Sequence, residues 1–148
     1  MEKKNEPFVI ERIFNASVEK VWKAITDNNE MKKWYFDIAE FKLQIGFEFR
    51  FVAGSNEKQW LHICMITEID QQKKLTYSWR YDGYAGVSYV TFELFPEGSK
   101  TRLKLTHSDL ESFPQDVPEL KKENFAEGWN YIVGTSLKEY LENKESLL

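Results

Sequence analysis

Two histidines are the side chains of this sequence best suited to acid–base chemistry, and they fall in separate segments. His107 has the same parity as Leu103 and Leu105, which places it on the apolar face of a predicted strand. There it would act as a proton acceptor or as a hydrogen-bond donor to a ligand. The alternative is a structural histidine whose hydrogen bonds are all made to other groups of the protein. His62 lies in a segment that is apolar on both faces, so the pattern leaves its direction open.

The single cysteine, Cys64, lies between apolar residues, and no basic neighbour in the sequence lowers the pKa of its thiol. We therefore expect an inert, buried thiol. One cysteine also excludes an internal disulfide and a multi-cysteine zinc site, and no group of His, Cys, Asp and Glu has ligand spacing. We predict no metal site and no cofactor, because glycine-rich phosphate loops and the G-x-S-x-G and H-E-x-x-H motifs are absent as well.

Aromatic residues make up 16% of the chain, with five Trp, seven Tyr and eleven Phe, which is more than a small core requires. We therefore predict a cavity whose lining residues, most of them aromatic, are Trp34, Phe36, Phe49, Phe51, Tyr77, Trp79, Val90, Phe92, His107, Phe125, Trp129 and Val133. The alternative is that these side chains fill the core and leave no space for a ligand. The hydroxyl groups of Tyr77 and Tyr81 would orient a polar group of a ligand or reach solvent at the rim.

Alternation with a period of two dominates the middle of the chain and predicts consecutive antiparallel strands. The predicted strands are 8–14, 47–51, 60–69, 75–81, 89–94 and 102–107. Turn residues separate them, among them Gly54-Ser55-Asn56 and Asp82-Gly83. Two short helical segments, 18–26 and 30–34, follow the first strand, and Ser17 has the residue type of an N-cap.

Strand 60–69 is the ambiguous one, because both of its faces are apolar. Trp60, His62, Cys64 and Ile66 share one parity, and we assign Leu61, Ile63, Met65 and Ile69 to the other face. If the second set faces outward, it forms an apolar patch typical of a homodimer; if it is covered, we expect a monomer.

The stretch 119–143 has apolar residues at helical spacing and predicts a long C-terminal helix. Its apolar residues are Leu120, Phe125, Trp129, Ile132, Val133, Leu137, Tyr140 and Leu141. Gly128 and Gly134 interrupt the pattern at a cost of about 1 kcal/mol each relative to Ala. A close approach of the helix to a sheet would explain them; the alternative is a core helix that tolerates two glycines. Strands with polar outer faces need one covering layer, and only this helix is long enough to supply it.

Composition and charge restrict the class of protein. A chain of 148 residues is expected to form one domain over 1–148, with a flexible N-terminal segment over 1–7. The net charge of -4, with acidic and basic residues well mixed, argues against a nucleic-acid partner. No run approaches the roughly 20 apolar residues of a membrane span, and the amino terminus lacks the apolar core of a signal peptide. Together with the lone cysteine, this predicts a cytoplasmic protein without stable membrane insertion.

Several local strings resemble the helix-grip fold of the START-like superfamily, also called SRPBCC. Residues 16–22, A-S-V-E-K-V-W, resemble its A-P-x-E-x-V-W opening, and Lys33-Trp34-Tyr35 resembles its K-W-F element. Segments 67–79, 90–94, 101–107 and 127–129 resemble later strings in the same order. Together they are similar to the single-domain bacterial form of the branch named for the activator of the ninety-kilodalton heat-shock chaperone's ATPase.

This resemblance implies an α+β fold in which a curved six-stranded antiparallel sheet wraps around the long C-terminal helix and encloses a cavity. We expect a non-enzymatic or weakly catalytic protein that binds a small hydrophobic molecule there, such as a lipid, polyketide or flavonoid-like compound. One alternative is a polyketide cyclase-like or dehydratase-like enzyme in which His107, with Tyr77 or His62, moves protons. The other is a co-chaperone-like regulator of a heat-shock chaperone ATPase, for which the residues themselves offer no support.

Overall fold

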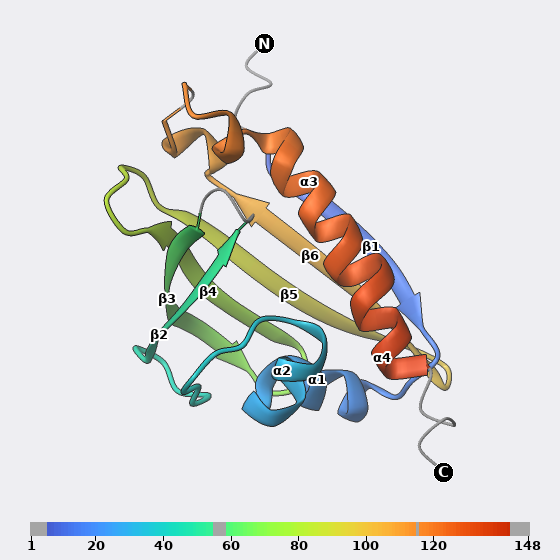
Figure 1. Ribbon diagram of the computed structural model, residues 1–148. Helices are drawn as coiled ribbons and strands as arrows, with labels where there is room; N and C mark the ends of the chain where they lie inside the picture. The colour runs from blue at the N-terminus through green and yellow to red at the C-terminus, as the bar shows by residue number, and fades with distance from the viewer. Residues whose placement is uncertain (1–5, 55–58, 115, 143–148) are drawn as a thin grey trace.

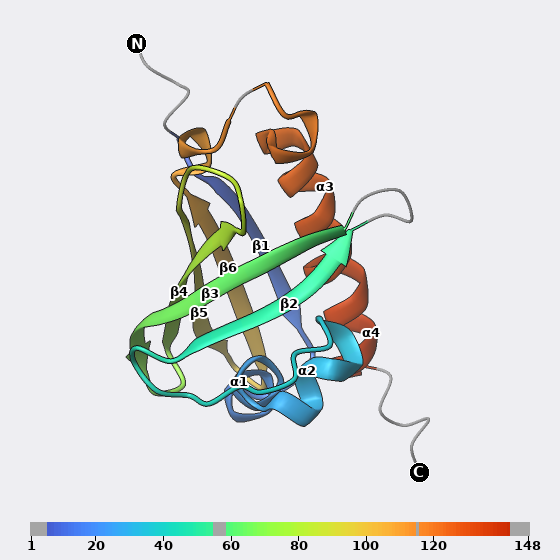
Figure 2. The ribbon, with the colours of Figure 1, turned by 60° about the vertical axis from the view of Figure 1, so that its left-hand side comes forward.

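The computed structural model describes residues 6–54, 59–114 and 116–142, and shows a sheet with helices against its concave face (Figure 1 and Figure 2). The strands are β1 (Phe8–Phe14), β2 (Glu48–Gly54), β3 (Gln59–Asp70), β4 (Lys74–Tyr81), β5 (Ser88–Glu97) and β6 (Lys100–Ser108). The helices are α1 (Val18–Thr26), α2 (Asn28–Trp34), α3 (Lys122–Tyr131) and α4 (Lys138–Glu142). Between them lie two 3-10 turns, η1 (Leu110–Ser112) and η2 (Pro118–Leu120), and a π-helical segment, η3 (Ile132–Leu137). Most of the predicted N-terminal segment 1–7, the turn residues Ser55 and Asn56, and Asn143 lie outside the described residues.

The strands form one six-stranded antiparallel sheet in the order β1-β6-β5-β4-β3-β2. From β2 to β6 each strand pairs with the next one in the chain, while β1 pairs with β6 at the other end of the chain order. The strand direction turns across the sheet, so that β2 and β3 run at a steep angle to β1 in Figure 2. The predicted helix-grip architecture is confirmed, and the curvature gives the sheet a concave inner face.

Strand β3 directs alternate side chains toward this inner face. Its buried inward residues are Trp60, His62, Cys64 and Ile66. A register shift follows between Ile66 and Glu68, and beyond it Ile69 pairs with the buried Leu75 of β4. The prediction that Ile69 lies on the same face as Ile63 is wrong, because the extra residue at this bulge reverses the alternation.

The residues Leu61, Ile63 and Met65 of β3 point to the outer face of the sheet, away from the helix. They do not form a uniformly open patch, since Ile63 is 4% exposed while Met65 is 41% exposed. The cross-strand partners of Ile63 are Arg50 and Arg80. Long arginine side chains cover apolar surface in this way while their charged ends stay in water, which accounts for the burial of Ile63.

The C-terminal helix begins at Lys122, later than predicted, because Pro118 opens a separate 3-10 turn and Lys121 is extended. From there it continues through α3, η3 and α4 to Glu142, the last described residue, and lies across the concave face of the sheet (Figure 1). Its buried inner residues are Phe125, Trp129, Val133, Leu137 and Leu141. The predicted long covering helix is therefore confirmed, with a shifted start.

These buried positions repeat every four residues, a spacing that a regular α-helix does not keep on one face. At 3.6 residues per turn, each four-residue step rotates the side chain by about 40° away from the previous one. The π-helical segment η3 has wider turns, which rotate the following positions back. Val133, Leu137 and Leu141 thus stay over the sheet.

Neither glycine of the C-terminal helix is required by close approach to the sheet. A methyl group at Gly128 would meet no atom within 4 Å, and one at Gly134 would lie 3.5 Å from Nε of Arg12, an ordinary contact distance. The predicted reason for these glycines is therefore wrong. Gly128 instead borders open space.

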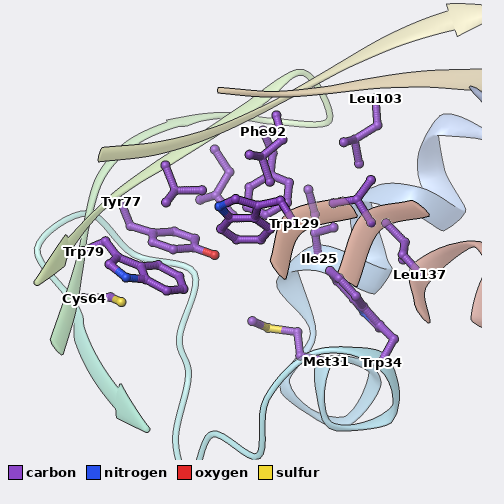
Figure 3. Packing of buried hydrophobic residues seen from close by; sticks show 14 of the residues in the cluster. Ile25, Met31, Trp34, Cys64, Tyr77, Trp79, Phe92, Leu103, Trp129 and Leu137 are labelled. Atoms are coloured by element: carbon purple, nitrogen blue, oxygen red, sulfur yellow. The ribbon is translucent and has the colours of Figure 1, made fainter. Parts of the chain in front are cut away.

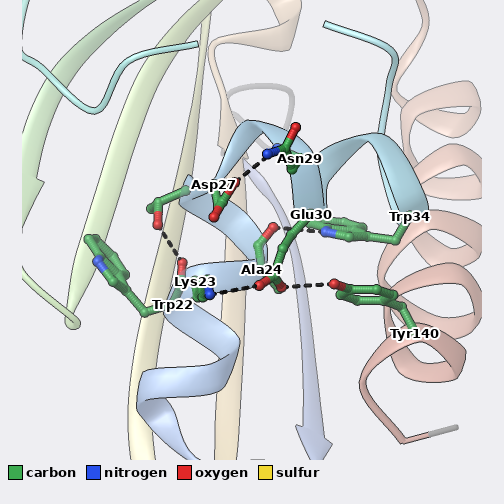
Figure 4. Close-up of polar contacts among 9 residues, drawn as sticks. Trp22, Lys23, Ala24, Asp27, Asn29, Glu30, Trp34 and Tyr140 are labelled. Atoms are coloured by element: carbon green, nitrogen blue, oxygen red, sulfur yellow. Dashed lines mark hydrogen bonds and ion pairs between the residues drawn. The ribbon is translucent and has the colours of Figure 1, made fainter. Parts of the chain in front are cut away.

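The second half of the C-terminal helix is tied to α1 and α2. The Tyr140 hydroxyl donates a hydrogen bond to the Glu30 carboxylate at 2.9 Å (Figure 4). Ser136 Oγ donates to the carbonyl of Trp34 at 2.7 Å, and the Trp34 indole donates to the carbonyl of Ala24 at 2.9 Å. This end of the interior is closed by helices packed against one another.

Candidate functional site

A cavity of about 320 Å³ opens between the sheet and the beginning of the C-terminal helix, at the end of that helix away from α1 and α2. Its walls come from the end of β2, the beginning of β3, the end of β4, the loop after α2, and the segment from η2 to the start of η3. The lining residues are Phe36, Ala53, Gly54, Trp60, His62, Trp79, Tyr81, Glu119, Leu120, Asn124, Phe125, Gly128, Trp129 and Ile132. Hereafter we call this cavity the pocket.

The structure divides the predicted lining residues into two groups. Phe36, Trp79, Phe125 and Trp129 line the pocket. The residues in the interior beyond it are Trp34, Phe49, Phe51, Tyr77, Val90, Phe92, His107 and Val133. Trp129 lies where the groups meet: its ring centroid is 5.5 Å from that of Trp79 and 6.3 Å from that of Phe92 (Figure 3).

Several residues that line the pocket were not predicted from the sequence to do so. They are Ala53, Gly54, Trp60, Glu119, Leu120, Asn124, Gly128 and Ile132. Only Trp60 had a usable signal, because it shares the parity of His62 at the start of its strand. The others come from a strand end, a 3-10 turn and the flank of a helix, where periodicity does not tell which segments face one another across a gap.

His107 is held in a fully satisfied chain of hydrogen bonds. The Trp129 indole N–H donates to His107 Nδ1 at 2.9 Å. Because Nδ1 accepts, the neutral ring carries its proton on Nε2, which donates to Ser88 Oγ at 2.8 Å; Ser88 in turn donates to the carbonyl of Trp79 at 2.9 Å. Burial lowers the pKa of His107 to about 3, so the ring is uncharged. Both nitrogens are occupied, which is the arrangement of a structural histidine.

His62 lies in the pocket wall, packed among aromatic rings. Its ring stacks on Phe51 with centroids 4.4 Å apart and planes inclined by 15°, and it meets Tyr81 edge-on at 4.7 Å. Burial lowers its pKa to about 4, although the carbonyls of Trp60 and Phe51 favour the charged form. With the Trp60 carbonyl 3.1 Å from Nδ1, the neutral ring donates from that nitrogen.

The wall formed by β4 presents a hydroxyl group next to these rings. The Trp79 indole N–H donates to the Tyr81 hydroxyl at 2.8 Å, and burial raises the pKa of Tyr81 well above its ordinary value. The ring of Phe113, from the segment after η1, supports this wall: its centroid lies 5.4 Å from that of Tyr81 and 5.9 Å from that of Phe125. The phenol is therefore fixed in position and neutral.

A pair of phenols, Tyr35 and Tyr77, lies in the interior beyond the pocket. The hydroxyl groups of Tyr35 and Tyr77 are 2.7 Å apart and bond to each other, and burial raises the pKa of both. Cys64 is fully buried nearby, and burial raises the pKa of its thiol, so it stays protonated. Of the three residues assigned to proton transfer, His107, Tyr77 and His62, the pocket is lined only by His62.

The rim of the pocket is polar on the side of η2 and α3. Glu119 and Asn124 both line it and are exposed. The Asn124 amide donates to the carbonyl of Pro118 at 2.5 Å, which joins the 3-10 turn to the first turn of α3. The mouth thus has a carboxylate beside an apolar interior.

Among residues 6–54, 59–114 and 116–142, no three His, Cys, Asp or Glu side chains are grouped so as to hold a metal ion. Nor does that part of the chain contain a helix of sufficient length and apolarity to cross a membrane.

The family model for activator of Hsp90 ATPase homolog 1-like proteins matches residues 15–142. The chain belongs to this family. The resemblance found in the sequence strings is thereby confirmed, and the matched range includes both short helices, five strands of the sheet in full, and the C-terminal helix that bounds the pocket. No curated protein matches the chain by sequence.

Solved structures of similar fold share little sequence with this family member. CV1439 from Chromobacterium violaceum has a TM-score of 0.77 at 20% identity, covering 93% of this chain and 97% of that one. Mll3558 from Rhizobium loti has a TM-score of 0.80 at 22% identity, covering 91% and 96%. CalU16 from Micromonospora echinospora has a TM-score of 0.69 at 24% identity, covering 95% and 79%. At these identities the likeness establishes the fold alone.

Proposed function

We propose that the protein binds a small, apolar, planar molecule in the pocket. The observation that carries this proposal is an open space lined by six aromatic side chains, at one end of an interior whose other end is closed by packed helices. A volume of about 320 Å³ lies at the small end of the range for ligand pockets. A ligand of one or two rings would fit this space better than a long acyl chain.

Ring surfaces would supply most of the binding free energy. Apolar area removed from water contributes about 25 cal/mol per Å², and aromatic pairs add to this when they stack with an offset or meet edge-on. Specificity would come from the Tyr81 hydroxyl, which already accepts a hydrogen bond from Trp79. Its own hydrogen has no acceptor among the described residues, so a ligand oxygen placed there would complete the pair.

Binding without turnover is the reading that the geometry supports best. The Tyr81 phenol is held neutral, and the low pKa of His62 makes it a weak base. His107 is engaged at both nitrogens and lies beyond the pocket wall. Within the described part of the chain, no pair of strongly acidic and basic groups converges on the space that a ligand would occupy.

Indole signals offer a site-specific test. Three tryptophans line the pocket, Trp60, Trp79 and Trp129, whereas Trp22 and Trp34 do not. In an NMR titration with bicyclic aromatic compounds, the indole N–H signals of the first three should shift and those of the other two should stay in place. A panel in which no compound binds more tightly than about millimolar would contradict the proposal.

A blocking variant makes the test sharper. Gly128→Leu places a branched side chain into open pocket space and should abolish the shifts. The matched control is Thr135→Leu, which adds a leucine to an exposed position of the same helix outside the pocket. Equal ligand binding by Gly128→Leu and the wild-type chain would show that the ligand binds elsewhere.

A further inference from the structure

The pocket surrounds its open space with ring surfaces that meet at an angle. The aromatic lining residues are Phe36, Trp60, Trp79, Tyr81, Phe125 and Trp129. The Trp60 and Tyr81 rings have centroids 5.4 Å apart and planes inclined by 67°, and the Trp79 and Trp129 rings are 5.5 Å apart and inclined by 58°. Rings inclined in this way form adjoining walls instead of one flat surface. A compact group inside the pocket would therefore face several rings at once.

The charges around this space have one sign. Among the described residues that line the pocket, Glu119 carries the only formal charge, and no lysine or arginine is found there. Within the described part of the chain, the Glu119 carboxylate forms no ion pair. The nearby Lys121 and Lys122 lie outside the lining, and Lys122 Nζ donates to the carbonyl of Glu6 at 3.2 Å. His62 adds no positive charge at neutral pH, since burial lowers its pKa to about 4.

We propose that the pocket selects a cationic apolar ligand, a tertiary or quaternary ammonium compound whose substituents pack against the rings while Glu119 balances its charge. This inference rests on the proposed function and specifies the class of ligand. The face of an aromatic ring attracts a cation within about 6 Å of its centroid. An ammonium group substituted with methyl groups also has apolar surface and few or no N–H donors, which suits a lining with few acceptors. An anionic ligand would meet the Glu119 carboxylate, and the described lining residues supply no cation beside it.

A pair of probes with nearly the same shape isolates the effect of charge. They are 3-hydroxyphenyltrimethylammonium and its neutral counterpart 3-tert-butylphenol, titrated at about pH 6.5, where both phenols are protonated, since the ordinary pKa of a phenol is about 10. We expect the cation to bind about tenfold more tightly at low ionic strength. If the neutral probe binds equally well or better, the cation preference is overturned while the proposed function stands. If neither probe binds and the aromatic panel also fails, both proposals fail.

The Glu119→Gln variant tests the carboxylate directly, and because residue 119 is exposed, the substitution leaves the packed interior unchanged. We expect it to weaken binding of the cation by about threefold to tenfold and to leave binding of 3-tert-butylphenol unchanged. The matched control is Glu123→Gln, an exposed carboxylate in the first turn of α3 that does not line the pocket. An equal effect of Glu119→Gln on both probes, or of both variants on the cation, would overturn the role of Glu119.

Discussion

The two ends of the C-terminal helix face the same sheet but bury their side chains differently. At the end formed by η3 and α4, Leu137 and Leu141 are almost fully buried against α1, α2 and the sheet, and Tyr140 donates a hydrogen bond to Glu30 of α2. At the end formed by η2 and the first turns of α3, the inner surface borders the pocket, and Gly128 adds no side chain to it. One end is a packed core and the other is a candidate binding site.

This difference follows from the number of covering elements at each end. Helices α1 and α2 lie beside α4 and close the lower end of the concave face, as Figure 1 shows. At the other end, the described chain supplies only the 3-10 turns and the loop after β4 around the start of α3. One helix cannot fill a strongly curved sheet along its whole length. The pocket is the space that remains where no further helix of the described chain packs beside the C-terminal helix.

Truncating one leucine at each end tests this comparison most strongly. Leu137→Ala should lower the free energy of unfolding by an amount near the top of the usual range of about 2.7–5 kcal/mol. The reason is that the cavity left by the truncated side chain is enclosed by packed side chains. Leu120→Ala removes the same atoms from an equally buried position, but its void joins the pocket, so we expect a cost near the bottom of that range. Urea unfolding of both variants measures the difference. Equal costs would show that the two ends are packed alike.

Acidification should destabilise the protein through its two histidines. The folded-state pKa values of about 3 for His107 and about 4 for His62 lie below the ordinary 6.5 of the unfolded chain. Between these values the unfolded chain binds more protons, so the stability is full above pH 6.5 and is lost as the pH falls. By about pH 5 the loss should reach about 2 kcal/mol for each histidine.

One substitution separates the loss of stability at low pH caused by His62 in the pocket wall from the loss caused by His107 in the core. His62→Phe keeps a ring that stacks on Phe51 and removes one of the two titrations, so the loss of stability between neutral pH and pH 5 should fall by about half. Urea unfolding across this range measures it. An unchanged pH dependence would mean that His62 is not kept neutral in the folded protein.

Replacing the two glycines of the C-terminal helix should change the stability less than the substitutions above, and Gly134 serves as the control for Gly128. Gly128→Ala should stabilise the protein by up to about 1 kcal/mol, because alanine favours the helix and its methyl group meets no atom within 4 Å. The same methyl group narrows the pocket and should weaken binding of an aromatic ligand. Gly134→Ala, outside the pocket, should leave binding unchanged. Thermal unfolding and the indole titration measure the two effects, and a Gly128→Ala variant with tighter binding would contradict this placement of the pocket wall.

Much of the fold was predictable because its signals are local. Alternation marks the strands, and Trp129 and Leu137 lie on the apolar stripe of a helix that the sequence shows directly. Two local irregularities escaped prediction: the bulge after Ile66, which moved Ile69 to the inner face, and the π-helical segment around Gly134. Each contains an extra residue that changes the direction of the side chains after it, and no residue type in the sequence marks its position.

The pocket was less predictable than the fold, for a reason that its residues illustrate. Parity shows that Phe49 and Trp79 both face inward, but it does not show how far each lies from the open end of the concave face. Depth depends on which elements cover which part of the sheet, and that is a property of the tertiary structure. Glu119 was missed because it belongs to a 3-10 turn opened by Pro118, which the extended Lys121 separates from the helix.

The hydrogen bond between Tyr140 of α4 and Glu30 of α2 gives an effect of similar size and tests the closed end alone. Tyr140→Phe removes the donor to Glu30 and should cost about 0.5–1.5 kcal/mol, since this is the net value of an ordinary hydrogen bond. Tyr131→Phe is the control, because Tyr131 is 64% exposed on the same helix and its substitution should change stability by less than about 0.5 kcal/mol. Neither variant should alter ligand binding, because neither residue lines the pocket. If Tyr140→Phe weakened binding as much as Gly128→Leu does, the two ends of the helix would be coupled, and the closed end would be part of the site.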